Sequence, residues 1–278
     1  MRTTTVLLED LGFPEGPRWH DGRLWFSDFH DQRVRALSPD GAHETVLQLQ
    51  ESPSGLGWTP EGDLLVVAME RRALLRVRGD ELEVVADLSE HTRVRANDLV
   101  VDASGGAYVS SFGFDLFAGA DPEPTVLVRV DPDGTTRVAA EDVHFPNGMV
   151  LSEDGRTLIV AETFAARLSA FDVAGDGSLS GRRVFAELPG VAPDGICLDA
   201  EGQVWVATAR TSEVLRVREG GDVTARVAIG SGSLSYACML GGDDGTTLFV
   251  CTAPSWRPGL RQGRIEVAQV DVGPSGQP

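Results

Sequence analysis

Both asparagines of this 278-residue chain, Asn97 and Asn147, occupy the same position of a short recurring motif. The other copies carry acidic, hydroxyl or phenol groups there: Pro14-Glu15-Gly16, Pro53-Ser54-Gly55, Pro193-Asp194-Gly195 and, more weakly, Ser235-Tyr236-Ala237. Two carboxylates and two carboxamides offer only oxygen donors, which suit a hard divalent cation. If the fold gathers these positions, they predict a metal site. Calcium suits it best, because Ca²⁺ accepts neutral amide oxygens, while Mn²⁺, Mg²⁺ and Zn²⁺ are compatible alternatives.

The spacing of the motifs predicts the fold that gathers them. Each motif is followed by a glycine turn, and from Gly22 the turns recur after 40, 43, 50, 47 and 43 residues, a period typical of β-propeller blades. Short apolar stretches before and after each turn indicate paired strands. We predict an all-β, six-bladed β-propeller with four-stranded blades and almost no helix. The last repeat shows three strands, so the N-terminal strand from Thr3 to Leu8 is expected to pair with it and close the ring.

Composition sets further expectations. No linker divides residues 1–278, so we expect one domain with a frayed tail at 273–278. The net charge of −18 and the absence of lysine argue against binding to nucleic acid or to a membrane surface. No leader or long apolar span is seen, which predicts a cytoplasmic location. The three cysteines lack metal-site spacing and are expected to be buried thiols. The oligomeric state stays open.

A propeller would place the six motif residues together. The innermost strand of each blade starts near the central axis, so repeat-equivalent residues form a ring at one mouth of the channel. We call this set the ring; its members are Glu15, Ser54, Asn97, Asn147, Asp194 and Tyr236. Asp, Asn and Ser also make local turns with the backbone, which is the structural alternative. The use of both asparagines at these positions favours a functional site.

Four of the motifs, with their flanking residues, carry a resemblance. The segments Phe13 to Pro17, Arg95 to Asp98, Phe145 to Gly148 and Pro193 to Gly195 resemble the signature segments of the regucalcin and gluconolactonase family, also called the senescence marker protein family. The similarity extends from about Leu11 to Val272. It implies a six-bladed propeller that binds a catalytic divalent metal and hydrolyses lactones of sugar acids.

The resemblance also implies roles for single residues. It makes Glu15, Asn147 and Asp194 metal ligands, with Asp194 also the proposed base. It places Asn97 beside the metal as a ligand or substrate contact, and Arg95 as a substrate contact. Ser54 is not a ligand in this family, so its replacement is expected to matter far less. Related propellers with the same ring hydrolyse organophosphates or aryl esters, so these reactions are alternatives to lactone opening.

General chemistry supports the same interpretation. A cation beside a lactone carbonyl stabilises the tetrahedral intermediate, and a nearby Asp194 can take the proton of the attacking water. No G-x-S-x-G motif is present, which makes covalent catalysis a poorer hypothesis. A non-catalytic calcium-binding propeller and a propeller that binds a protein or peptide remain rival hypotheses.

Loops on the ring side are expected to select the substrate. The two long ones, 112–124 and 253–263, are apolar or aromatic and could form a lid or pack on the domain. Such walls favour a lactone or ester with apolar parts over a fully hydroxylated sugar lactone. His144 could approach the site, while His20, His30, His43 and His91 are expected elsewhere. Five residues near the ends of second strands are further candidates for the same mouth: Asp28, Glu70, Ser111, Glu162 and Arg210.

Overall fold

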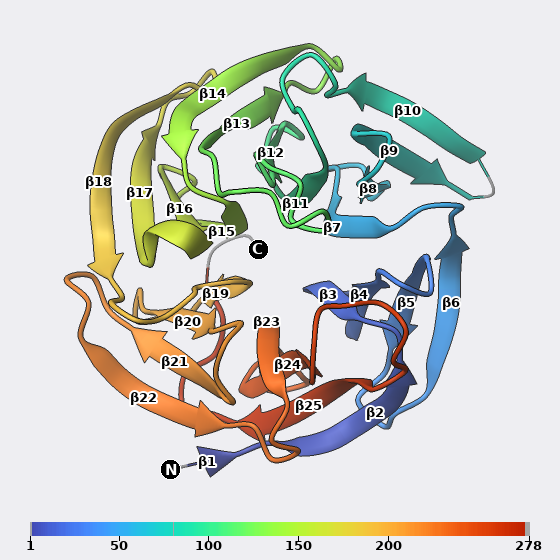
Figure 1. The fold of residues 1–278 in the computed structure, drawn as a ribbon, viewed down its shortest axis with the longest axis vertical. Coiled ribbons are helices and arrows are strands. Elements are labelled where there is room, and N and C mark those ends of the chain that lie inside the picture. The colour runs from blue at the N-terminus through green and yellow to red at the C-terminus, as the bar shows by residue number, and fades with distance from the viewer. Residues whose placement is uncertain (1, 80, 276–278) are drawn as a thin grey trace.

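Six antiparallel sheets stand around a central axis in the computed structural model, which describes residues 2–79 and 81–275 (Figure 1). Blades one to three contain β3 (Pro14–His20), β4 (Arg23–Asp28), β5 (Arg33–Leu37), β6 (His43–Gln48); β7 (Pro53–Trp58), β8 (Leu64–Ala68), β9 (Ala73–Arg78), β10 (Glu81–Asp87); β11 (Ala96–Val101), β12 (Ala107–Ser111), β13 (Thr125–Val130) and β14 (Thr136–Val143). Blades four to six contain β15 (Pro146–Leu151), β16 (Thr157–Glu162), β17 (Arg167–Val173), β18 (Leu179–Glu187); β19 (Ile196–Leu198), β20 (Val204–Ala207), β21 (Glu213–Val217), β22 (Val223–Ala228); β23 (Leu234–Gly241), β24 (Thr247–Ala253), β25 (Gly263–Gln269) and β2 (Thr5–Leu11). The predicted six-bladed propeller is confirmed. Within the described residues the helical content is one 3₁₀ turn, η1 (Thr163–Ala165).

The burial pattern of the strands follows from stacking the blades. An inner strand of a blade is covered on both faces by the two neighbouring blades. The strand β8 accordingly reads Leu-Leu-Val-Val-Ala, and every residue in it is buried. The outer strand β10 reads Glu-Leu-Glu-Val-Val-Ala-Asp and is mostly exposed. The hydrophobic core is therefore a series of clusters between adjacent blades, as where Leu65 and Leu74 of blade two meet Leu99 and Val109 of blade three. Cys197, Cys238 and Cys251 are buried free thiols, as expected.

The N-terminal segment closes the ring, as predicted, with shifted bounds. Strand β2 pairs antiparallel with β25, with Thr5 opposite Val267 and Leu11 opposite Gly263. A second pairing was not expected: the short β1 (Arg2–Thr3) runs parallel to β22 and extends blade five. The same segment therefore joins blades five and six at the edge of the molecule (Figure 1).

A buried carboxylate fixes this junction. Glu266 of β25 is fully buried and accepts hydrogen bonds from the hydroxyls of Thr4 at 2.5 Å, Ser231 at 2.5 Å and Thr252 at 3.0 Å. Thr4 lies between β1 and β2, and its hydroxyl oxygen also accepts the backbone N–H of Gly230 at 2.8 Å. Hydroxyl donors thus satisfy a charge that would be costly to bury alone.

The inner strands approach closely where the ring residues stand. A Cβ atom on Gly148 would lie 2.6 Å from the backbone nitrogen of Ile196, and one on Gly55 would lie 2.3 Å from that of Leu99. No real side chain tolerates such contacts. At these two positions the glycine after the ring residue is therefore required, because the next blade's backbone lies against it.

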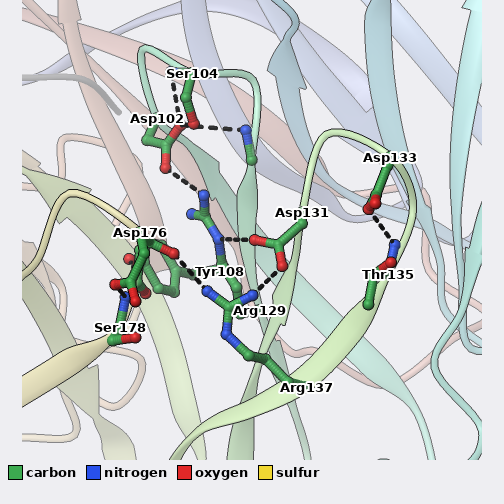
Figure 2. A network of polar contacts seen from close by, with 12 residues as sticks. Asp102, Ser104, Tyr108, Arg129, Asp131, Asp133, Thr135, Arg137, Asp176 and Ser178 are labelled. Atoms are coloured by element: carbon green, nitrogen blue, oxygen red, sulfur yellow. Dashed lines mark hydrogen bonds and ion pairs between the residues drawn. The ribbon is translucent and has the colours of Figure 1, made fainter.

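Polar contacts, drawn in Figure 2, also tie blade three to blade four. Buried Arg129 pairs with Asp102 at 2.6 Å and Asp131 at 3.1 Å, and its guanidinium lies over the Tyr108 ring. The Tyr108 hydroxyl donates to the carbonyl of Gly177 in the turn between β17 and β18, at 2.8 Å. This network links the two blades.

The chain end differs from the expected frayed tail as far as it is described. Residues 273–275 lie against the turn after β19: the N–H of Ala200 bonds to the Gly273 carbonyl at 2.9 Å, and that of Ser275 to Leu198 at 2.9 Å. Pro274 forms an isolated bridge with Asp199. Residues 276–278 lie outside the described residues. Across 2–79 and 81–275, no helix has the length and apolar content to cross a bilayer.

Candidate metal and active site

The ring converges on one cavity. A space of about 210 Å³ is lined by five ring residues, while Ser54 lies behind them. The lining members are Glu15, Asn97, Asn147, Asp194 and Tyr236. Each stands within the first few residues of an innermost strand or shortly before it, in β3, β11, β15, β19 and β23. The structure therefore brings together every residue predicted as a metal ligand, although Glu15 and Asp194 are 179 residues apart in the sequence.

A chain of hydrogen bonds orients the two carboxamides. The Ser54 hydroxyl donates to Asn97 Oδ1 at 3.2 Å, and Asn97 Nδ2 donates to Asn147 Oδ1 at 3.1 Å. Asn147 Nδ2 in turn points to the Thr163 hydroxyl at 3.4 Å, which donates to the Pro193 carbonyl at 2.7 Å. Each amide oxygen accepts one bond and keeps a second lone pair for another partner.

The two ring carboxylates are buried without a counter-ion. Glu15 and Asp194 are only 9% and 5% exposed, and within the described residues neither forms an ion pair. Asp194 Oδ1 is buried and has no hydrogen-bond partner among the described protein atoms. Burial, reinforced by Asp98, raises the pKa of Glu15 to about 8 against the opposing Gly16 N–H and Arg18. Burial, with Glu15 and Asp98 nearby, also raises the pKa of Asp194 well above its usual value.

This arrangement fits a divalent cation. Two carboxylates that are desolvated and mutually repelling favour a positive charge between them. The orphaned Asp194 oxygen and the spare lone pairs of the two carboxamides supply the hard oxygen donors that calcium prefers. The described residues contain no group of three or more His, Cys, Asp or Glu side chains placed to hold a metal, so such a site must include the amides.

Asp98, next to Asn97, is occupied elsewhere. Its carboxylate pairs with buried Arg18 at 3.0 Å and accepts the Leu99 N–H at 2.7 Å. Burial raises the pKa of Asp98 even so, with Arg18 opposing the shift. Arg18 also donates to the Leu99 carbonyl at 2.6 Å, so this pair lies beneath the ring and braces β3 against β11.

Arg95 does not line the cavity. Its guanidinium pairs with Glu70 at 3.1 Å. The same guanidinium lies 4.1 Å from the centre of the Phe117 ring, and Phe117 does line the cavity. A role for Arg95 as a substrate contact therefore stays a prediction.

The histidine expectations need one correction. His30, expected on the surface, lines the cavity, stacks on Phe13 and has its Nε2 3.0 Å from the Trp256 carbonyl oxygen. His144 does not line it; its side chain is 41% exposed and lies 3.4 Å from Asp142. His30 was missed because its position follows the second strand of its blade, outside the ring motif.

The position after the second strand contributes to the cavity lining in several blades. Residues within a few positions after the second strands supply much of the remaining lining: Phe29, His30, Phe112, Thr163, Ala209 and Arg210. Carboxylates at or near the same ends brace the backbone instead. Asp28 accepts the N–H of Phe13 at 2.8 Å, Glu70 that of Ser52 at 2.9 Å and Glu162 that of His144 at 2.9 Å.

Ser111 and Arg210 are the remaining two of these candidates, and one of them lines the cavity. Ser111 bonds to the Thr125 hydroxyl at 2.8 Å and is not part of the lining. Arg210 is exposed at the cavity rim. Of the five second-strand candidates, only Arg210 lines the cavity.

The two long loops meet over the ring. Phe117 of the 112–124 loop and Trp256 of the 253–263 loop both line the cavity, and their rings make an edge contact at 5.4 Å. We call this pair the aromatic roof. Blades three and six are opposite each other in a six-bladed ring, so the contact crosses the mouth of the channel (Figure 1).

Comparison with known proteins agrees with this architecture. The family described as SMP-30/Gluconolactonase/LRE-like region matches residues 13–254. The chain is 25% identical to regucalcin of Danio rerio over 91% of this chain and 87% of that protein. It is 28% identical to 6-deoxy-6-sulfogluconolactonase of Pseudomonas putida over 86% and 82% of the two chains.

A solved structure extends the match to three dimensions. A gluconolactonase from Xanthomonas campestris superimposes with a TM-score of 0.77 at 26% identity, over 95% of this chain and 89% of that one. The family match covers most of the chain and includes the ring residues from Glu15 to Tyr236. This chain belongs to the SMP-30/gluconolactonase/LRE-like family.

Proposed function

We propose that this protein is a metal-dependent lactonase, with Ca²⁺ as the preferred metal. The observation that carries the proposal is the pair of buried, unpaired carboxylates, Glu15 and Asp194, beside two oriented carboxamides in one small cavity. Relatives named as lactonases of sugar acids support the reaction class.

Four ring residues would hold the cation: Glu15, Asn147 and Asp194, with Asn97 as a further ligand or substrate contact. A cation bound there supplies Lewis acidity, which polarises a carbonyl oxygen placed beside it. The Ser54 hydroxyl and Thr163 keep the carboxamides turned toward the cavity.

Asp194 would act as the general base. It lines the cavity, and its Oδ1 has no hydrogen-bond partner among the described protein atoms, so it is free to accept a proton from a water beside the cation. As the water oxygen bonds to the carbonyl carbon, Asp194 takes a proton from it. The ring C–O bond then breaks, and Asp194 returns the proton to the departing ring oxygen, giving the open hydroxy acid. Tyr236, whose buried hydroxyl has no partner among the described residues, can donate a hydrogen bond to the reacting oxygens.

The test combines turnover with metal binding. Protein stripped of metal is offered five- and six-membered lactones with and without Ca²⁺, Mn²⁺ or Zn²⁺, and acid release is followed. Asp194→Asn should keep its circular dichroism spectrum and lose about 10²–10⁴-fold in turnover. Asp243→Asn, which removes an exposed carboxylate from the turn between β23 and β24, is the control and should match wild type.

Metal binding has its own readout. Added Ca²⁺ should raise the melting temperature of wild type and of Asp243→Asn, and much less that of Glu15→Gln. Metal-dependent stabilisation without acid release would favour the aryl ester or phosphotriester alternatives, or a calcium-binding role. Acid release that is unaffected by chelation and by Asp194→Asn would contradict the proposal.

A further inference from the structure

Resting on the lactonase function above, we propose that the substrate is a small lactone with one apolar substituent, such as a short alkyl chain, which packs under the aromatic roof. The proposal concerns what fills the cavity away from the ring carboxylates. It deepens the proposed function because it names the class of lactone.

The cavity walls are aromatic on both sides. On one side Phe112 stacks on Phe145 with ring centres 4.7 Å apart, and Phe145 meets Phe164 at 5.2 Å. On the other side Phe13 packs against Tyr236 at 4.7 Å. All five residues line the same cavity, so an apolar group there would exchange water for ring surfaces.

The aromatic roof extends these aromatic walls, and two arginines outside the cavity contact its rings. The Arg95 guanidinium lies 4.1 Å from the Phe117 ring centre, and that of Arg257 lies 5.1 Å from the Trp256 ring centre. Neither arginine lines the cavity. Each cation can stabilise the position of its ring.

Partners for substrate hydroxyls are scarce beyond the ring. Thr163 already donates to the Pro193 carbonyl, and His30 Nε2 is within hydrogen-bond distance of the Trp256 carbonyl oxygen. Arg210 is exposed at the rim. A polyhydroxylated lactone would therefore place several hydroxyls against aromatic rings, and each unpaired polar group costs binding energy.

Cavity size limits the substituent. The volume of about 210 Å³ is below the ~300–1,000 Å³ usual for drug-sized ligands. It suits a five- or six-membered ring with a short chain and excludes a bulky polycyclic ester.

The experiment compares kcat/KM for gluconolactone, methyl-bearing δ-hexalactone and pentyl-bearing δ-decalactone with the metal-loaded protein. The alkyl lactones should exceed gluconolactone by about tenfold or more, with the longer chain preferred, since each buried methylene can contribute about tenfold. Phe117→Ala and Trp256→Ala should lose most of the gain from the longer chain. Leu260→Ala, an exposed change in the same loop as Trp256, should retain it.

A binding arm separates this inference from the proposed function. Pentyl-substituted and polyhydroxylated δ-lactams resist hydrolysis, so their effect on the melting temperature reports binding alone. Preference for the pentyl lactam in wild type, reduced in Phe117→Ala, supports the apolar cavity even if no lactone is opened, which would overturn only the lactonase function. Preference for gluconolactone and for the hydroxylated lactam, or an unchanged preference in Phe117→Ala, would overturn the inference.

Discussion

At the scale of residues, the site depends on hydrogen-bond partners that are not themselves proposed metal ligands. Asn97 and Asn147 could each rotate about the bond to the amide, yet Ser54 fixes one and Thr163 the other. Asp98, an anion next to Asn97, is held by Arg18 beneath the ring. The proposed ligands are therefore positioned by a surrounding layer of hydrogen bonds, as in many metal sites.

Ser54 gives the clearest prediction at this scale. Ser54→Ala removes the donor that orients Asn97 Oδ1, so metal affinity should fall by about tenfold. The expected fall is smaller than that for Glu15→Gln, which removes a charge. Calcium titration followed by calorimetry measures both constants. Ser38→Ala, a change in the turn after β5, is the control. A Ser54→Ala affinity equal to that of wild type would show that the hydroxyl does not position the amide.

The sequence predicted the ring residues but not all of their neighbours. Glu15, Asn97, Asn147 and Asp194 share a repeat position, and a repeat position maps to one place in a propeller. His30 follows the second strand of its blade, a repeat position outside the ring motif, whereas the Glu70 partner of Arg95 depends on how one loop folds. Loop conformation is set by local packing and has no repeat to reveal it.

At the scale of elements, the junction of blades five and six rests on one buried carboxylate. Thr4→Val keeps the side-chain shape and removes a hydrogen bond to Glu266, which costs about 1–3 kcal/mol for a buried polar group. The melting temperature should fall by about 2–4 °C for each kcal/mol in a protein of this size. Thr5→Val, one residue later on an exposed position of β2, is the matched control and should change little. Equal melting temperatures for the two variants would contradict this role.

The strands themselves were predictable because alternating apolar stretches and glycine turns are local signals. Their exact bounds were less so. The N-terminal strand was expected at Thr3 to Leu8, whereas the chain divides at Thr4 into β1 and β2. The division follows from the burial of the Thr4 side chain against Glu266, a contact between residues 262 positions apart.

At the scale of the whole molecule, we predict that the six blades unfold together. Clusters such as that of Leu65, Leu74, Leu99 and Val109 join neighbouring blades, so each blade depends on the next. Differential scanning calorimetry of metal-loaded protein should show one transition whose calorimetric and van't Hoff enthalpies agree. Two separated transitions would indicate that residues 1–278 do not form one domain.

The overall fold was more predictable than the mouth of the channel. Six repeats of similar length specify the number of blades, and an incomplete last repeat specifies how the ring closes. The meeting of Phe117 with Trp256 could not be read from the repeats, because it joins two insertions from opposite blades. The contact does, however, join aromatic side chains of the two loops that were predicted to be apolar or aromatic.

The pairing of β2 with β25 also has a consequence for the order of folding during synthesis. On the ribosome, Leu8 is made 257 residues before its partner Ile265. At ordinary elongation rates of about 5–20 residues per second, roughly 10–50 s pass between the synthesis of β2 and that of its partner β25. During that interval five blades can form while the circle is still open, so β2 joins its sheet only after the strands of those blades have been made.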